Sequence, residues 1–171
     1  MELFTTYDRQ GRAGDLVPRQ DVHRLGLWHK SVQVFVFDAG GDLLLQRRAT
    51  NKDLYASLWD YSVGEHLQPG EEYLAGAHRG LFEELGIHGL TLTSLGQERW
   101  VEVVGDDYAD REIQQAFRGI YSGALAPDPV EVAQVRYLSM NEIGSWVAAR
   151  PADFTPWFVA DLRVFGLLEE G

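Results

Sequence analysis

The sequence contains no cysteine among its 171 residues. This absence excludes disulfide bonds, zinc–thiolate sites, thiol catalysis and thiol-based redox sensing. Positive charge is also scarce, because 15 Lys and Arg residues stand against 26 Asp and Glu residues, a formal net charge of -11. A chain this acidic has no general attraction to nucleic acid polymers or to an anionic membrane. The charge of a phosphorylated substrate must therefore be met locally, most readily by a divalent cation.

Long apolar runs are missing as well, and no window approaches the length of a membrane span. Residues 1–8 show neither the basic start nor the apolar stretch of a secretory signal, so we expect a cytoplasmic protein. Apolar residues make up 45% of the chain and aromatic residues 12%, enough for a proper core. The length favours a single domain over residues 1–171.

The hydrophobic pattern predicts a mixed α/β chain. Ser139 lies three residues before Glu142, the spacing of a capping box, and Thr155 followed by Pro156 predicts the cap of a last helix. The apolar face of that helix is expected to include Trp157, Val159, Val164 and Leu167. A sheet with helices on both faces is the economical arrangement. We expect strands at 2–8, 32–37, 43–48, 59–63, 90–104, 111–121 and 133–138, a turn at 11–15, and helices at 18–25, 71–85, 140–149 and from 156 onward.

The chemistry is concentrated between Ser62 and Ile87. On the predicted helix, Arg79 and Glu83 are four residues apart and can form an ion pair. Glu83 and Glu84 are neighbours whose side chains leave the helix about 100° apart, so both can reach one patch. Two carboxylates near one point repel each other unless a cation lies between them. Oxygen ligands of this kind suit Mg²⁺, with water and phosphate oxygens completing its octahedron.

This stretch resembles the Nudix box, in which Gly, five residues, Glu and seven residues precede Arg-Glu-aliphatic-x-Glu-Glu-x-Gly-aliphatic. The matching positions in this chain are Glu71, Arg79, Leu81, Glu83, Glu84, Gly86 and Ile87. The branch that it resembles is the one related to isopentenyl-diphosphate isomerases, through residues 28–30 and 58–64. The resemblance implies a Nudix fold, a mixed sheet between helices (α/β/α), with a short N-terminal extension at 1–28 and the box loop and helix at 64–87.

Two positions depart from the pattern. Glu65 stands where the box opens with Gly, and Gly80 stands where the family has a Glu that is usually a metal ligand. Glycine inside a helix costs about 1 kcal/mol relative to alanine, so something should justify it. Either the helix backbone approaches another segment closely or a bulky group occupies the space. We expect weaker metal affinity, or fewer bound metals, than in a complete box.

The resemblance implies a Mg²⁺-dependent hydrolase that cleaves a pyrophosphate bond in nucleoside di- or triphosphates, or related derivatives, by attack of water on phosphorus. Mn²⁺ is a possible substitute. Arg79 would orient Glu83, and Glu71 would stiffen the loop–helix junction beside the substrate. Glu131 is our candidate for an additional ligand or the general base, with Glu112 as second choice. The expected catalytic residues are Glu84, Glu83, Arg79 and Glu131, and the expected metal ligands are Glu83, Glu84, Glu131 and the carbonyl of Gly64.

The nearest basic cluster consists of Arg47, Arg48 and Lys52, of which at least one is expected to meet a phosphate oxygen. Together with Glu71 they form the expected substrate-binding set. Arg47 and Arg48 alternate along a strand, so one of them should face solvent. The aromatic residues that could stack on a base are Trp28, Tyr55, Trp59 and Trp100, although such residues more often belong to the core.

Histidines receive a structural interpretation, because single histidines at loops and helix ends rarely bind metals. This applies to His23, His29 and His78. His66 is the stronger candidate for a metal ligand, because it follows Gly64, where the isomerases keep a metal-binding His.

Two other functions compete with the hydrolase. An isopentenyl-diphosphate isomerase would use a cysteine near position 64, where this chain has Gly64. A non-catalytic binder would follow if the loss of the Glu at position 80 had silenced the site. The expected partner is a small phosphorylated molecule, and monomer and homodimer both stay open.

Overall fold

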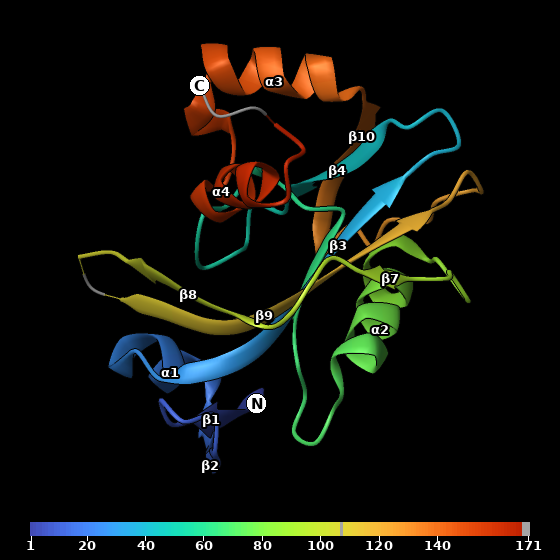
Figure 1. Cartoon of the computed structure of the whole chain (residues 1–171). Coiled ribbons are helices and arrows are strands. Elements are labelled where there is room, and N and C mark those ends of the chain that lie inside the picture. Colours follow the sequence, from blue (N-terminus) through green and yellow to red (C-terminus); the bar gives the residue numbers. More distant parts are fainter. Residues whose placement is uncertain (107, 169–171) are drawn as a thin grey trace.

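Strand β3 (Trp28–Phe37) forms the centre of the fold in the computed structural model, which describes residues 1–106 and 108–168. It pairs in parallel with β9 (Ala109–Ile120) along its whole length. On its other edge it pairs antiparallel with β6 (Val63–His66) and, through Phe37, with β4 (Leu43–Arg48). Figure 1 shows β3 and β9 crossing the middle of the molecule.

The other strands extend this sheet at its edges. β7 and β8 pair with β9, β5 and β10 pair with β4, and the hairpin of β1 and β2 joins β3 through Tyr7. The strands are β1 (Leu3–Tyr7), β2 (Ala13–Pro18), β5 (Trp59–Asp60), β7 (Thr93–Ser94), β8 (Arg99–Val104) and β10 (Val132–Leu138). The helices are α1 (Arg19–Leu25), α2 (Tyr73–Leu85), α3 (Met140–Ala149) and α4 (Pro156–Val164), with a 3-10 turn η1 at Pro151–Asp153.

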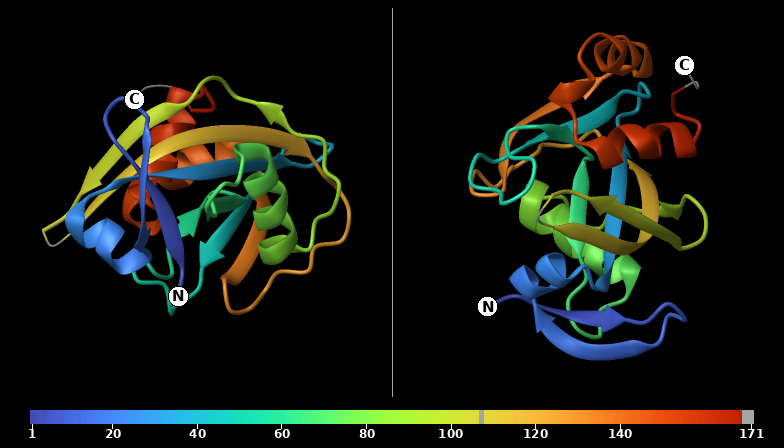
Figure 2. Two further views of the ribbon diagram at one scale, coloured as in Figure 1. Left: turned by 90° about the horizontal axis from the view of Figure 1, so that it is seen from below. Right: turned by 90° about the vertical axis from the view of Figure 1, so that its left-hand side faces the viewer.

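Helices cover both faces of the sheet, as the sequence predicts (Figure 2). Successive side chains of a strand point to opposite faces, so β3 contributes to two cores. On one face its valines pack with α2, in a core that includes Val32, Val34, Val36, Ala77, Leu81 and Leu85. On the other face its phenylalanines pack with α3 and α4, in a core that includes Phe35, Phe37, Ile143, Phe158 and Leu162. No helix of the described residues is long and apolar enough to cross a membrane.

The predicted strand at 59–63 is wrong in one respect, because the chain divides there into β5 and β6. β5 pairs with β4, whereas β6 pairs with β3. Ser62 makes the transition between the two partners: its hydroxyl donates to the carbonyl of Leu44 and accepts from the amide of Val36 at 2.8 Å. The buried serine thus joins both neighbouring strands and carries the chain from one to the other.

Other boundaries also differ from the prediction. The expected turn at 11–15 ends early, because Ala13 already begins β2. The expected strand at 90–104 is interrupted where Ser94 bonds with both backbone groups of Gly96, whose φ of +130° favours glycine. α2 begins at Tyr73 rather than at Glu71, whose amide closes a turn onto the carbonyl of Gln68.

The last helix is capped differently from the prediction. Thr155 lies at the N-cap, but its hydroxyl donates to Asp60 Oδ1 at 2.9 Å instead of accepting from the first turn. The buried residues of α4 are Phe158, Asp161 and Leu162, and Trp157, Val159 and the following Leu167 pack partly buried against the same core. The expected apolar face is therefore confirmed except at Val164, which is exposed.

The capping box at Ser139 and Glu142 is confirmed, with both reciprocal bonds formed. We expect Ser139→Ala to lower the free energy of unfolding by about 1 kcal/mol, since it removes one of these bonds. Urea unfolding followed by circular dichroism measures this. Ser139→Thr keeps the hydroxyl and is the matched control, so equal losses in both variants would contradict the assignment.

Candidate functional site

The end of α2 presents a buried carboxylate, Glu84, to a cavity. Only 7% of Glu84 is exposed, and its Oε2 accepts a hydrogen bond from Gln46 on β4. Its Oε1 accepts no hydrogen bond from the described residues. Burial, followed by the negative charge of Glu65, raises the pKa of Glu84 to about 8. Because the unionised form is favoured by burial and repulsion, a nearby cation would stabilise the carboxylate.

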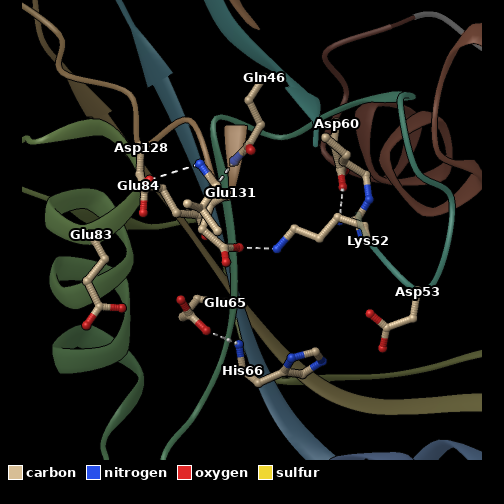
Figure 3. A network of polar contacts seen from close by, with 12 residues as sticks. Gln46, Lys52, Asp53, Asp60, Glu65, His66, Glu83, Glu84, Asp128 and Glu131 are labelled. Carbon is tan, nitrogen blue, oxygen red and sulfur yellow. Dashed lines mark hydrogen bonds and ion pairs between the residues drawn. The ribbon is translucent and has the colours of Figure 1, made fainter. Parts of the chain in front are cut away.

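The cavity beside Glu84, which we call the α2 cavity, has a volume of about 590 Å³ and is lined by both acidic and basic side chains. Its acidic lining consists of Glu2, Glu65, Glu83, Glu84, Asp128 and Glu131, and its basic lining consists of Arg19, Arg48, Lys52 and Arg79. Figure 3 shows Glu65, Glu84 and Glu131 gathered beside α2, with Lys52 reaching toward them from the opposite side. Carboxylates suit a hard divalent cation and the bases suit phosphate oxygens, so the cavity can accommodate both.

The predicted basic residues divide between the cavity and its exterior. Lys52 lines the cavity and pairs with Glu131, while Arg48 lines it and donates to the carbonyl of Leu54 at 2.9 Å. Arg47 is exposed and donates to the carbonyl of Ser57, outside the cavity. One of the two arginines therefore faces solvent as predicted. Contact of Lys52 and Arg48 with substrate stays a prediction.

Arg79 connects the loop to the helix. Its guanidinium donates to both carboxylate oxygens of Glu71 at 2.9 Å, to the carbonyl of His66 at 2.8 Å, and to Glu83 at 3.2 Å. Glu71 also accepts from the amide of Gln68 and does not line the cavity. The geometry thus fits a junction role for Glu71 and an orienting role for Arg79. Contact of Glu71 with substrate stays a prediction.

A second group of donors lies on the other side of β6. It consists of His23, His29, His66, Asp110 and Glu112, which form two overlapping sets whose ligand atoms lie within 4.8 Å of one another. The residues come from α1, β3, β6 and β9, and the strand register places His29 opposite Glu112. His29 Nε2 lies 3.6 Å from Asp110 Oδ1 and 3.7 Å from Glu112 Oε1. We refer to these five residues as the imidazole centre.

Unpaired atoms converge in the imidazole centre. The Nε2 atoms of His23 and His29 and the Oδ1 atom of Asp110 are buried and have no hydrogen-bond partner among the described residues. The Nδ1 atom of His29 lies 3.1 Å from the carbonyl of Leu27, a contact that leaves the Nε2 lone pair free when Nδ1 carries the proton. Buried polar atoms are rarely left unpaired, so their convergence indicates a cation site. The mixed donor set suits Mn²⁺, Fe²⁺ or Zn²⁺.

Three members of the imidazole centre are in the protonation state that binds a metal. Burial, followed by the charge of His66, lowers the pKa of His23 to about 4 and that of His29 to about 3, so both rings are neutral near pH 7. Burial alone would raise the pKa of Glu112, but a hydrogen bond from His66 at 3.1 Å holds it well below its usual range. The same hydrogen bond raises the pKa of His66 against the effect of burial, and burial raises the pKa of Asp110 to about 7, so a metal entering the centre would displace protons from these two residues.

Sequence reasoning missed most of the imidazole centre. It assigned His23 and His29 structural roles, did not single out Asp110, and ranked Glu112 second to Glu131. The one local signal is the alternation of Asp110 and Glu112, which places both on one face of a strand. His78 lies on α2 and belongs to neither of the two donor sets.

A smaller inner cavity of about 70 Å³ adjoins the imidazole centre. Its polar lining includes Ser31, Gln33 and Gln114, and Gln33 is 3% exposed with an unpartnered Oε1. Gly64 and Glu65 line both cavities, so β6 separates and connects them.

The predicted stacking aromatics lie in different surroundings. Trp28 and Trp100 pack edge-to-face on each other with ring centroids 4.8 Å apart, and Trp59 belongs to the core. The ring of Tyr55 packs on Trp157, which lines the inner cavity. Tyr55 thus contacts a residue that lines a cavity, and stacking on a base stays a prediction for all four.

A model of the NUDIX domain matches residues 27–158, and the chain belongs to the Nudix family. Among curated proteins it is 35% identical over 162 residues to an isopentenyl-diphosphate Delta-isomerase of Nocardia farcinica, covering 92% of this chain and 90% of that protein. Among solved structures, a Deinococcus radiodurans protein matches with a TM-score of 0.70 and 20% identity over 86% of this chain and 90% of that one. The Nudix hydrolase RenU of M. smegmatis matches with a TM-score of 0.58 and 18% identity, over 96% and 91% of the two chains.

Proposed function

We propose that the protein is a divalent-metal-dependent hydrolase that cleaves the pyrophosphate linkage of a nucleoside di- or triphosphate, or of a related nucleoside diphosphate derivative. The observation that carries the proposal is the cavity that the carboxylates of α2 line together with Lys52 and Arg48. A diphosphate bound there would meet both a cation held by the carboxylates and the basic side chains. The volume of about 590 Å³ suits a small molecule rather than a polymer.

The residues of the α2 cavity have distinct proposed roles. Glu83, Glu84, Glu131 and the carbonyl of Gly64 are the proposed holders of Mg²⁺, or of Mn²⁺ in its place. When bound, the metal supplies charge neutralisation at the phosphate oxygens. Lys52 and Arg48 orient the diphosphate, and Arg79 holds the loop and Glu83 in place. Glu131 acts either as one of the metal ligands or as the general base that accepts the proton of the attacking water.

The curated relatives favour a second candidate, an isopentenyl-diphosphate isomerase. Two observations argue against it. The chain has no cysteine, and Gly64 stands where the proton-transferring thiol would lie. The inner cavity beyond Gly64 has a volume of about 70 Å³ and a polar lining that includes the amides of Gln33 and Gln114, so it offers little room or apolar surface to a prenyl chain. A metal in the imidazole centre is compatible with either function and does not decide between them.

Assays with purified protein distinguish these functions. In Mg²⁺, a panel of nucleotides, dinucleotides, nucleotide sugars and coenzyme A is expected to yield phosphate, pyrophosphate or a nucleoside monophosphate from at least one compound. Isopentenyl diphosphate is expected to show no double-bond migration by NMR. Migration at an enzymatic rate would contradict the proposal. Tight nucleotide binding without turnover would identify a non-catalytic binder instead.

A further inference from the structure

The two departures from the Nudix box, Glu65 and Gly80, lie in contact with each other. A β-carbon at position 80 would lie 2.7 Å from Cγ1 of Val63 and 3.2 Å from Cβ of Glu65. Both distances are shorter than ordinary carbon contacts. Glycine at position 80 therefore lets α2 pack closely against the Val63 and Glu65 side chains of β6. A glutamate side chain at position 80 of the helix and the Glu65 side chain on the strand would therefore occupy the same space.

The Glu65 side chain lines the α2 cavity together with Glu84. Figure 3 shows Glu65 between α2 and His66. Its Oε1 accepts from the amide of His66 at 3.0 Å and its Oε2 pairs with Arg79 at 3.2 Å. Each carboxylate oxygen has two lone pairs, so one on each oxygen is still available.

A second observation points to a ligand at this place. Glu84 is more than nine-tenths buried, and its Oε1 has no hydrogen-bond partner among the described residues. This oxygen is not among the fully buried unpartnered atoms of the described residues, so it opens on the cavity, where a cation beside the two carboxylates would stabilise their ionised forms.

We propose that Glu65 supplies from β6 the metal-binding carboxylate that the Nudix pattern places on α2 at position 80. Positions 65 and 80 are in contact, so a carboxylate on β6 replaces the one that the family pattern places on α2. The cavity therefore keeps the full number of acidic side chains despite Gly80. This inference rests on the proposed metal site of the hydrolase.

Magnesium binding without substrate tests the exchange. We expect Glu65→Gln to weaken Mg²⁺ binding, measured by titration calorimetry, by about tenfold or more. Glu72→Gln is the matched control, because Glu72 is exposed on the same loop–helix junction and its side chain caps nothing. Glu65→Gln keeps the shape of the side chain, so a folding defect is not expected.

The reciprocal exchange separates a ligand from a structural partner of Arg79. Gly80→Glu alone is expected to lower the melting temperature through its contacts with Val63 and Glu65. The double variant Glu65→Gly/Gly80→Glu restores the family pattern and removes the contact with Glu65. Below its melting temperature, which the contact with Val63 still lowers, it is expected to recover Mg²⁺ affinity to within about threefold of the unmodified protein. A role confined to pairing with Arg79 predicts no such recovery.

Two outcomes would overturn the inference. Either Glu65→Gln binds Mg²⁺ as tightly as Glu72→Gln, or Glu84→Gln loses Mg²⁺ while every folded Glu65 variant keeps it. In the second case the proposed hydrolase site survives and only the role of Glu65 is lost. Conversely, if no substrate is cleaved but Mg²⁺ binding follows Glu65, the inference stands and the hydrolase proposal fails.

Discussion

Replacing Glu84 by glutamine is expected to reduce hydrolysis of the best substrate about a thousandfold, which corresponds to about 4 kcal/mol of transition-state stabilisation. The physical reason is the position of this side chain. It is buried, held by Gln46, and leaves one oxygen free toward the cavity. An amide oxygen occupies the same space without the negative charge that a hard cation requires. Initial rates in saturating Mg²⁺ measure the effect.

Stability measurements test whether the loss of activity results from misfolding of the Glu84→Gln protein. The metal-free Glu84→Gln protein is expected to melt no lower than the unmodified protein, because near pH 7 a neutral amide of the same shape replaces a carboxyl group whose pKa of about 8 keeps it largely unionised. Glu72→Gln, which changes an exposed carboxylate, should leave the rate unchanged. Full turnover by Glu84→Gln in Mg²⁺ would remove the basis for the proposed reaction.

The second large effect is expected from metal in the imidazole centre. Three buried atoms, on His23, His29 and Asp110, have no partner among the described residues, so a cation that fills the centre should stabilise the fold. At a thousandfold excess over its dissociation constant a ligand contributes about 4 kcal/mol. For a chain of this length that raises the melting temperature by about 10 °C. Differential scanning fluorimetry with Mn²⁺, Fe²⁺ or Zn²⁺ measures the shift, and a strong chelator should reverse it.

Two histidine variants make this prediction specific. His23→Ala removes one imidazole from α1 and is expected to weaken metal binding by about a hundredfold, measured as metal content after dialysis. His78→Ala removes a histidine that belongs to neither donor set and should retain the metal. The centre is disproved if the unmodified protein holds none of the three metals and its melting temperature does not respond to them. Glu84→Gln should still load this centre, since Glu84 is not one of its donors.

The residues that the sequence located correctly belong to one short segment. Arg79, Glu83 and Glu84 lie on consecutive turns of a single helix, and helical geometry places them from spacing alone. The structure confirms the contact between Arg79 and Glu83 and adds Glu71 and the carbonyl of His66 as partners. These additions come from the loop before the helix, whose path spacing does not specify.

The imidazole centre required information that no local pattern contains. His29 and Glu112 meet because β3 and β9 pair in parallel with one particular register. His66 joins them because β6 pairs with β3 antiparallel, with Ser31 opposite His66. A shift of either register by one residue would turn these side chains to the opposite face of the sheet.

The sequence by itself determined the fold family, the α2 carboxylates, the acidic surroundings that favour a cation, and the absence of a thiol. These properties depend on composition or on contacts within one helix. Only the tertiary structure decided that five separate residues form the imidazole centre and that Glu65 occupies the space left by Gly80. Such contacts join segments far apart along the chain, and the packing of α2 against β6 and the register of the sheet decide which side chains meet.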